Sequence, residues 1–395
     1  MNITKDDLRG KTVLVRVDFN VPVEDEIVQD VARIRNVYPT IKYLQDAGAK
    51  IVLMSHLGKT ATANSKQSLK IVVEAVRKEF CSNIIFIDDC IAENAKNIIE
   101  QASFNDIILL ENLRFHAEEE ACDEKFAEKL ASLADFYINE AFSVSHRKHA
   151  SVFAVPKFLP HALGFSFRKE VQVVDNFFGN AESPKMCIIG GSKLATKIKL
   201  LKNLVKKVDK LALGGGIAGA FLAFLGNGSL KIFDPKEYSD DVVEIIKNAK
   251  EHNCELIMPT DFSALISDND SFEHTIISSE ASNASIFDIG PESVALFKKH
   301  VDESKVILWN GPVGLFEKAP FDFGTRVLAE HIAQRTRDKH VTSIIGGGDT
   351  GFAMKKFKVA HDMSYISTAG GAFLSYLEGS ELAGITAMQD AYTLV

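Results

Sequence analysis

The sequence predicts an α/β protein in which two doubly wound parallel-sheet domains are joined by a long helix. Short runs rich in Val, Ile and Leu alternate with segments of helical periodicity along most of the chain. This alternation is typical of parallel sheets that helices cover on both faces. The chain has 395 residues, a length that favours two or three domains over one. One helical segment, residues 164–184, separates two such series of similar size.

The first series predicts a domain over residues 1–163. Its first helix, residues 33–48, carries apolar residues at helical spacing from Ile34 to Leu44, and Gly48 suits its end. The expected strands are residues 11–19, 50–56, 83–89, 106–112 and 135–142, and the further expected helices are residues 68–80, 91–101 and 123–133.

The second series predicts a domain over residues 185–379. Its expected strands are residues 185–191, 210–216, 255–262, 305–312, 342–349 and 364–371, with helices between most of them. The segment between the two series, "GFSFRKEVQVVDNFFGNAESP", is expected to form one long interdomain helix that ends near Gly179 and Pro184.

Composition and charge indicate a cytoplasmic protein. The formal net charge of −8 argues against general affinity for nucleic acids or membranes. The chain has no apolar signal core at its N-terminus, and no apolar stretch approaches the ~20 residues of a membrane helix. The cysteines form no C-x-x-C pair, so we expect free thiols in a reducing compartment and no zinc site.

In the first domain, charged and polar side chains follow the strands. They are Asp18, Asn20, His56, Arg114 and Arg147, and Arg33 opens the next helix. Ligands of open α/β sheets bind beyond the carboxyl ends of the strands. Because guanidinium groups hold carboxylate and phosphate in bidentate fashion, this set suits a small anion that carries both groups.

In the second domain, glycine turns follow the strands: "GGSK", "GGG", "NGP", "GGGD" and "TAGG". Such turns at helix N-termini suit phosphate groups. The stretch "GGGDTG" matches G-x-G-x-x-G, but it ends the series instead of beginning it, and Asp349 lies inside the turn. A carboxylate beside a pyrophosphate requires a bridging cation, for which Mg²⁺ is suited.

Two lysines mark the start of an expected helix in "KMCIIGGSKLATKIKLL". A cation at a helix N-terminus costs about 0.3–1 kcal/mol, and the i, i+4 spacing of Lys193 and Lys197 would place both on one face. They could be solvated surface lysines, but beside the glycine turns they favour a bound polyphosphate. An anion site in one domain and a nucleotide site in the other predict phosphoryl transfer across a hinge cleft that closes to exclude water.

The chain resembles phosphoglycerate kinases over essentially its whole length. The resemblance rests on "VLVRVDFNVP", "SHLGK", "LLENLRFH", "LASLADFYINEAFSVSHRKHAS", "GGSKLATKI", "VILWNGPVGLFE", "IIGGGDT" and "ISTAGGAFLSYLEG". It implies a monomeric, cytoplasmic enzyme of glycolysis and gluconeogenesis with two Rossmann-like domains. It implies reversible transfer of a phosphoryl group from 1,3-bisphosphoglycerate to ADP with Mg²⁺. The first domain would bind 3-phosphoglycerate, the second would bind nucleotide, and residues 380–395 would pack back on the first.

The same resemblance implies the site residues. The 3-phosphoglycerate site would comprise Asp18, Phe19, Asn20, Arg33, His56, Leu57, Gly58, Lys59, Arg114 and Arg147. The ATP site would comprise Lys197, Glu317, Gly346, Gly347, Gly348, Asp349 and Thr350, with Glu317 at the ribose and Asp349 as the metal-linked carboxylate. The catalytic groups would be Arg33 and Lys193 as cations on the transferring phosphoryl group, with Gly370 and Gly371 at a helix start facing it.

Several positions depart from the family pattern. Lys59 stands where arginine is usual, Ala195 and Thr196 replace a frequent Ser-Asp pair, Glu140 replaces Asp, and Ala369 replaces glycine. None of them removes a main catalytic cation, so we expect effects on affinity more than on the type of reaction.

Two other functions fit parts of the pattern. An NAD-dependent oxidoreductase would explain "GGGDTG" and the α/β alternation, but it would not need Lys193, Lys197 or the internal Asp349. A non-catalytic nucleotide-binding protein of the same architecture would be expected to lose some of the site cations, which are present here.

Overall fold

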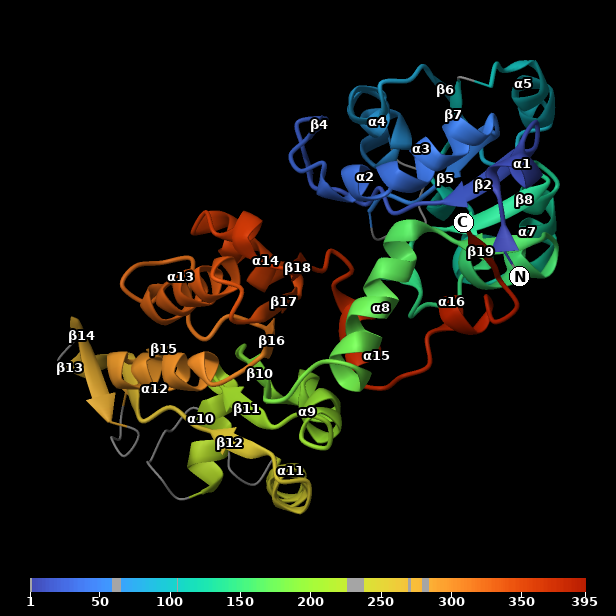
Figure 1. Cartoon of the computed structure of the whole chain (residues 1–395). Helices are drawn as coiled ribbons and strands as arrows, with labels where there is room; N and C mark the ends of the chain where they lie inside the picture. Colours follow the sequence, from blue (N-terminus) through green and yellow to red (C-terminus); the bar gives the residue numbers. More distant parts are fainter. Residues whose placement is uncertain (1, 59–64, 105, 226–237, 269–270, 279–283) are drawn as a thin grey trace. The chain divides into compact units, whose positions relative to one another are not determined.

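The computed structural model describes residues 2–58, 65–104, 106–225, 238–268, 271–278 and 284–395 (Figure 1). Internal contacts divide the chain into two compact units. Unit 1 is Met1–Gln172 with Glu381–Val395, and unit 2 is Val173–Ser380. The division falls inside the long helix α8 (Phe165–Gly179), which lies within the segment expected to join the domains.

Unit 1 is built on one eight-stranded sheet of order β1-β19-β9-β8-β2-β5-β7-β6, and its strand pairs are parallel. The strands are β1 (Asn2–Ile3), β2 (Thr12–Arg16), β5 (Lys50–Met54), β6 (Ile84–Ile87), β7 (Ile107–Leu110), β8 (Phe136–Asn139), β9 (His161–Leu163) and β19 (Tyr392–Leu394), and a separate hairpin pairs β3 (Val23–Glu24) with β4 (Ile27–Val28). The last strand of the chain therefore lies inside the sheet of unit 1.

Alternate residues of the central strands pack into two different cores, as a doubly wound sheet requires. Val13 and Val15 of β2 belong to one apolar cluster, and Leu14 between them belongs to the other. The helices of unit 1 are α1 (Lys5–Leu8), α2 (Ala32–Asn36), α3 (Tyr38–Ala47), α4 (Val73–Phe80), α5 (Ala95–Gln101), α6 (Ala117–Glu120), α7 (Glu124–Ala131) and α16 (Ala383–Thr386).

The prediction of a single helix over residues 33–48 is wrong in one respect. This segment forms two helices, α2 and α3, which meet at Val37. Pro39 explains the break, because it lies in the first turn of α3, where the missing N–H costs no hydrogen bond. Gly48 ends α3 with a φ of 69°, a left-handed conformation that glycine adopts without strain.

Unit 2 contains a six-stranded parallel sheet of order β12-β11-β10-β16-β17-β18. Its strands are β10 (Lys185–Ile189), β11 (Lys210–Leu213), β12 (Glu255–Ile257), β16 (Val306–Asn310), β17 (Thr342–Gly346) and β18 (Tyr365–Ile366), and its helices are α9 (Ile198–Leu204), α10 (Gly215–Phe224), α11 (Ser239–Glu251), α12 (Pro291–Asp302), α13 (Phe323–Arg337), α14 (Gly348–Lys356) and α15 (Gly371–Leu377). The strand order reverses between β10 and β16, which makes the carboxyl ends of these strands the topological switch point.

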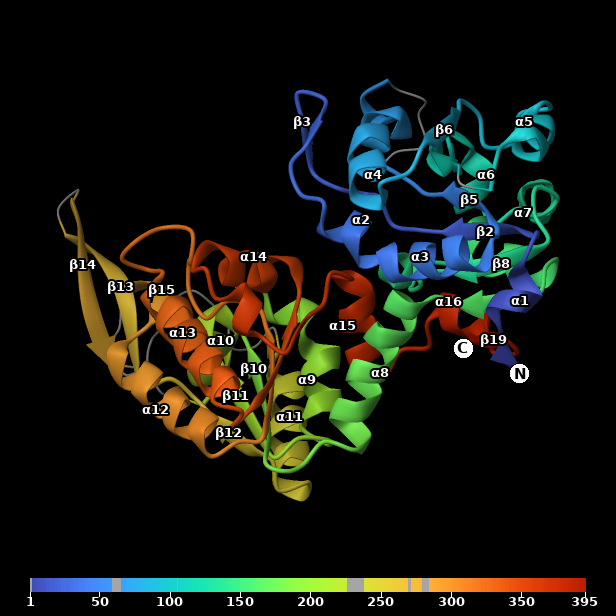
Figure 2. The ribbon, with the colours of Figure 1, turned by 45° about the horizontal axis from the view of Figure 1, so that its top comes forward.

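A second, antiparallel sheet in unit 2 was not predicted. It joins β13 (Asp261–Asp268) to β14 (Ser271–Ser278) and to β15 (Ala284–Ile289). Figure 2 shows β13 and β14 projecting from the rest of unit 2 near α12. The prediction of one strand over residues 255–262 is wrong. Strand β12 ends at Ile257, before Pro259, and β13 begins a new sheet at Asp261.

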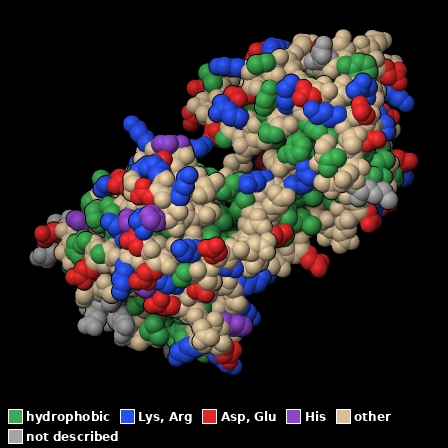
Figure 3. All heavy atoms as spheres, in the orientation of Figure 1, with side chains coloured by type: hydrophobic (Ala, Val, Ile, Leu, Met, Phe, Trp, Pro, Cys, Tyr) green, Lys and Arg blue, Asp and Glu red, His purple; other side chains and the backbone are tan. Residues whose placement is uncertain are grey.

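The surface is mixed in charge. Figure 3 shows basic and acidic side chains interspersed over the face in view. Among the described helices, none has the length and apolar character that crossing a membrane would need.

Candidate functional site

The polar residues predicted in unit 1 gather at one edge of its sheet. Asp18 and Asn20 follow β2, His56 follows β5, and Arg114 follows β7. Because β5 and β7 lie in order beside β2 and all three are parallel, their carboxyl ends meet at the same edge. The expected cluster is therefore formed by the sheet topology.

Asp18 holds Arg33 and Asn20 in place. Its carboxylate lies 3.0 Å from Arg33 Nη1 and accepts a 3.0 Å hydrogen bond from the Asn20 N–H and another from Ser143 Oγ. Arg33 Nη1 also donates to the Asn20 carbonyl at 2.7 Å. Asp18 is buried and Arg33 is partly exposed, so the guanidinium is fixed at the edge of the cluster.

His56 is neutral in this environment. It is buried, and its Nδ1 lies 3.2 Å from Arg16 Nη2, which has only protons to donate. Burial, followed by the charges of Arg16 and Arg114, holds the pKa of His56 well below its ordinary value. The imidazole can therefore offer its other ring nitrogen, Nε2–H, as a neutral hydrogen-bond donor.

Arg114 is a buried cation with unused donors. Its Nη1 donates to the Gly58 carbonyl, and its Nε lies 3.3 Å from Glu120 Oε1. Its Nη2 is buried and has no hydrogen-bond partner among the described residues. Burial and the nearby charge of Arg147 lower the pKa of Arg114. An anionic oxygen would satisfy this donor and offset the repulsion between the two guanidinium groups.

The remaining predicted residues of unit 1 contribute in different ways. Arg147 is exposed, with its Nε 3.2 Å from His146 Nε2. Phe19 and Leu57 are buried, so only their backbone can face a ligand. The Gly58 N–H donates to Asn20 Oδ1 at 2.9 Å. Lys59 lies outside the described residues.

Sequence reasoning missed a buried network behind this cluster. Glu119 accepts hydrogen bonds from the Ser151 N–H at 2.8 Å and Ser151 Oγ at 2.6 Å, and Arg16 Nε donates to the same Oγ at 2.9 Å. Burial, with the charges of Arg16 and Arg114, lowers the pKa of His149 to about 4. The one available signal was Arg16 itself, a charge inside the apolar run "VLVRV".

In unit 2, a pocket of about 330 Å³ lies at the switch point of the parallel sheet. Its lining residues are Gly190, Gly191, Ser192, Lys193, Thr196, Lys197, Asn310, Gly311, Pro312, Gly347, Gly348, Asp349, Thr350, Gly370, Gly371 and Leu374. The first residues of α14 and α15 are among them, so backbone N–H groups at helix N-termini border the pocket. Gly346, also predicted, is buried at the end of β17 and accepts from Asn310 Nδ2 at 2.8 Å.

The two lysines line this pocket, but not from one helix as expected. Lys193 precedes the 3₁₀ turn Leu194–Thr196, and Lys197 precedes α9. Lys197 Nζ donates to Asn310 Oδ1, and burial lowers the pKa of Lys197. Lys193 is exposed.

Glycine is required where strands β10 and β17 end. A Cβ added to Gly190 would lie 2.1 Å from the Pro312 carbonyl oxygen, and one added to Gly347 would lie 2.8 Å from Asn310 Nδ2. Gly347 also has a φ of 92°. These close approaches leave the pocket lined by bare backbone, as the glycine turns in the sequence predict.

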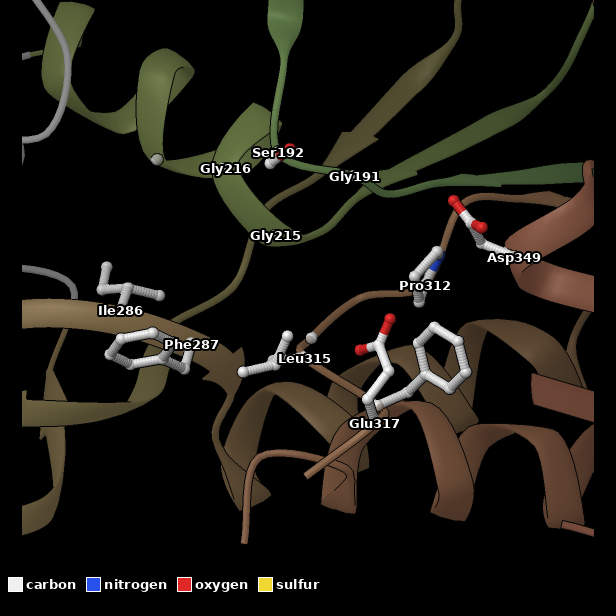
Figure 4. Close-up of a pocket in the computed structure, with 13 residues that line it drawn as sticks. Gly191, Ser192, Gly215, Gly216, Ile286, Phe287, Pro312, Leu315, Glu317 and Asp349 are labelled. Atoms are coloured by element: carbon white, nitrogen blue, oxygen red, sulfur yellow. The ribbon is translucent and has the colours of Figure 1, made fainter. Parts of the chain in front are cut away.

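A second pocket of about 410 Å³ continues from the first, and both are lined by Gly191, Ser192, Pro312 and Asp349. Figure 4 shows Phe287 and Leu315 on its wall, with the carboxylate of Glu317 between Leu315 and Pro312. Its volume suits a small organic ligand. Sequence reasoning missed Phe287 and Ile286 because their strand, β15, was not predicted.

Asp349 is the residue best placed to hold a metal ion near this site. It is exposed in the first turn of α14 and lines both pockets. A different group, Asp89, Cys90 and His116, has ligand atoms within 4.8 Å of one another. There, His116 Nε2 already pairs with Asp89 Oδ1 at 2.9 Å, and burial raises the pKa of the Cys90 thiol, which disfavours the thiolate that a metal needs.

The residues that depart from the family pattern are accommodated. Glu140 is buried and accepts from the Phe167 N–H at 3.0 Å, in the first turn of α8. Thr196 Oγ1 donates to the Lys193 carbonyl at 2.9 Å, and Ala195 is exposed beside it. Ala369 is buried, and its N–H donates to Ser367 Oγ at 3.2 Å.

Comparison with known proteins gives a consistent result over nearly the whole chain. A model of the phosphoglycerate kinase family matches residues 3–380. Curated phosphoglycerate kinases from Bradyrhizobium diazoefficiens and Dictyoglomus turgidum are 41% and 40% identical to the chain, over 97% and 99% of it and 97% and 98% of their own lengths. The solved phosphoglycerate kinase structure from Coxiella burnetii has a TM-score of 0.87 at 33% identity and covers 99% of both chains. That from Pyrococcus horikoshii has a TM-score of 0.80 at 28% identity and covers 97% of this chain and 96% of its own.

Proposed function

The chain belongs to the phosphoglycerate kinase family, and from that premise we propose how its two sites carry out the reaction. The enzyme is a phosphotransferase of glycolysis that moves a phosphoryl group between 1,3-bisphosphoglycerate and ADP. The bond between phosphorus and the acyl oxygen breaks, and a bond forms between phosphorus and a β-phosphate oxygen of ADP. The products are 3-phosphoglycerate and ATP. The two alternatives, an NAD-dependent oxidoreductase and a non-catalytic nucleotide-binding protein, find no support among the relatives.

We assign the nucleotide site to unit 2 because its apolar pocket and its glycine-lined pocket share lining residues and form one continuous site. The apolar pocket takes the base and ribose, with Glu317 at the ribose, and the glycine-lined pocket takes the phosphates beside Lys197. The phosphate loop comprises Gly346, Gly347, Gly348, Asp349 and Thr350. Neutral backbone donors and a partly buried lysine hold phosphate oxygens strongly because little water competes for them.

We assign the cluster of unit 1 to the phosphoglycerate ligand. Arg114 and Arg147 bind the phosphate and carboxylate groups of the ligand, and the neutral imidazole of His56 donates a hydrogen bond. The full set of proposed contacts is Asp18, Phe19, Asn20, Arg33, His56, Leu57, Gly58, Lys59, Arg114 and Arg147. The Nη2 of Arg114, which has no hydrogen-bond partner among the described residues, is the observation that supports this assignment most directly.

The proposed catalytic groups come from both units. Arg33 of unit 1 and Lys193 of unit 2 neutralise charge on the transferring phosphoryl group, and the backbone of Gly370 and Gly371 at the start of α15 faces it. In-line transfer requires the two ligands to meet, so we infer that the units close on each other during turnover and exclude water.

Mg²⁺ is the proposed metal, and the residues present fit it. An exposed carboxylate at Asp349, on the border of both pockets, suits an ion that takes few protein ligands and several phosphate oxygens. When bound, the ion would neutralise negative charge on the nucleotide phosphates. We also infer a cytoplasmic monomer, as the family resemblance implies. The net charge of −8 supports the inference that it binds neither nucleic acid nor membrane.

A coupled assay with 3-phosphoglycerate, ATP and Mg²⁺ tests the proposal. We expect acyl phosphate formation that depends on all three. Tight nucleotide binding without turnover would instead support the non-catalytic alternative. Sedimentation at several protein concentrations tests the monomer.

A further inference from the structure

Asp288 lies directly behind the apolar wall of the nucleotide pocket. It is a buried residue of β15, and the two residues before it, Ile286 and Phe287, line the pocket. Its Oδ2 accepts a 2.6 Å hydrogen bond from the Gly324 N–H in the first turn of α13, and its Oδ1 accepts a 2.9 Å bond from the Ile289 N–H. One carboxyl group thus ties α13 to the strand that forms the wall.

The same carboxyl group contacts the other half of the wall. A Cβ added to Gly314 would lie 2.0 Å from Asp288 Oδ1, so the loop backbone packs against the carboxylate. Gly314 and Leu315 line the pocket, and the Leu315 N–H donates to the Phe287 carbonyl at 2.7 Å. Asp288 therefore contacts the strand and the loop that supply lining residues of the apolar pocket, and it ties them to the start of α13. Asp288 itself is not a lining residue.

Ionisation of this group changes its hydrogen bonds. As a carboxylate it accepts at both oxygens, and it stabilises the positive N-terminus of α13. When protonated it loses the charge and part of its acceptor capacity. Burial raises the pKa of Asp288 to about 7, in spite of the Gly324 and Ile289 N–H groups, so both forms are populated near neutral pH.

We propose that Asp288 is a positioning residue whose carboxylate form holds the apolar wall in its binding shape, so that nucleoside affinity follows the ionisation of this group. The inference rests on the proposed nucleotide function of the pocket. It adds a residue that does not contact the ligand but sets how well the pocket receives it.

The effect of Asp288 on the pH dependence must be distinguished from the effects of other charged groups near the wall. Asp322 is the N-cap residue of α13 but makes no side-chain cap hydrogen bond, and its carboxylate lies 3.7 Å from Arg326 Nε. Lys356 Nζ donates to the Phe316 carbonyl at 2.7 Å. His274 packs on Phe321, which in turn packs on Phe287. Glu317 and Asp349 line the pocket, and Lys318 is exposed beside Glu317.

The test measures adenosine affinity as a function of pH, by NMR titration of the full chain. Adenosine is the probe because it has no phosphate that titrates near neutrality. We expect wild-type affinity to rise about tenfold from about pH 6 to about pH 8, since the binding-competent fraction of a group with a pKa of about 7 rises by that factor. In Asp288→Asn we expect a change of less than about twofold over this range, and at the higher pH an affinity about tenfold below wild type, the scale of one lost charge-assisted hydrogen bond.

Asp261→Asn is the matched control. Asp261 is also buried in unit 2 and caps a helix, because its carboxylate accepts from the Ser293 N–H at 2.7 Å and the Glu292 N–H at 3.0 Å in α12. It is not a lining residue of the pocket. A merely structural role for Asp288 predicts that both variants lower stability alike and keep the wild-type pH profile. Retention of that profile in Asp288→Asn would overturn the proposal.

A second measurement avoids any dependence on the folding of the variant. Calorimetry of adenosine binding to wild type, in buffers of different ionisation enthalpy near neutral pH, should show release of a fraction of a proton on binding. Binding without proton release would contradict the role of Asp288 and leave the nucleotide function intact. No binding of adenosine or of ADP at any pH would contradict the nucleotide function itself.

Discussion

Lys197 and Arg114 are cations in surroundings that disfavour their charge. Burial lowers the pKa of each, and the Arg147 charge lowers that of Arg114 further. A group of this kind destabilises the empty site and stabilises the occupied one, because a bound anion restores the favourable environment of the cation. The affinity of each ligand should therefore depend strongly on these residues.

Lys197→Ala should weaken ADP and ATP binding far more than 3-phosphoglycerate binding. The loss of one charge-assisted contact is worth about 1.5–3 kcal/mol, roughly tenfold to a hundredfold in affinity. Isothermal calorimetry measures it. Lys202→Ala is the control, because Lys202 also belongs to α9 but pairs with Asp241 at 2.7 Å. Unchanged ADP affinity in Lys197→Ala would refute its assignment.

Arg147→Ala should raise the dissociation constant of 3-phosphoglycerate by a similar factor and leave that of ADP unchanged. Its neighbour Lys148 provides the control, since it is exposed and lies over the Phe153 ring at 4.6 Å. Lys148→Ala should change neither constant. An equal loss of both ligands in Arg147→Ala would indicate damage to the fold and not loss of a contact.

At this scale the sequence singles out the exposed and strand-end candidates, but not the buried residues behind them. Arg33 and Lys193 become candidates because charged and polar residues recur at the strand ends of the first domain and because Lys193 lies beside the glycine turns of the second. Glu119 and Asp288 look like ordinary acidic residues in the sequence. Their roles depend on partners such as Ser151 and Gly324, which only the folded chain brings to them.

At the scale of elements, the parallel sheets were predictable because most of their strands are short, nearly continuous apolar runs between helical segments. The antiparallel sheet was not, because β13 to β15 lack such runs and Pro259 interrupts the segment before them. Strand β19 carries no periodic signal in its three residues (Tyr392–Leu394), yet it pairs with both β1 and β9. Contacts between chain ends of this kind are set by tertiary structure.

Glu140 is expected to be the main stabiliser of the first turn of α8. It accepts from the Phe167 N–H at 3.0 Å and from the side chains of Thr40 and Ser166. Glu140→Ala leaves these buried donors without an acceptor and should lower the free energy of unfolding by about 2–4 kcal/mol.

The control is Asp123→Ala, which removes the acceptor of the Phe126 N–H at the less buried start of α7 and should cost about 1 kcal/mol. Urea unfolding followed by circular dichroism compares the two variants. Equal losses in the free energy of unfolding would show that Glu140 stabilises the protein no more than an ordinary helix cap does.

At the scale of the whole molecule, the proposed catalytic cations belong to different units. Arg33 is in unit 1, and Lys193 is in unit 2. The account requires both to act on the same phosphoryl group during turnover, where charge spread over that group makes each cation more useful in the transition state than in the ground state.

The most direct test is the steady-state kcat of Arg33→Ala, Lys193→Ala and the double variant, with ligand affinities measured separately. Each single change should lower kcat by at least ~100-fold, the scale of one lost preorganised donor, with a much smaller effect on binding. Because both residues act on one group, the double variant should lose less than the product of the single losses. A near-normal kcat in either single variant, or losses that multiply fully in the double variant, would contradict the claim that the two units share one transition state.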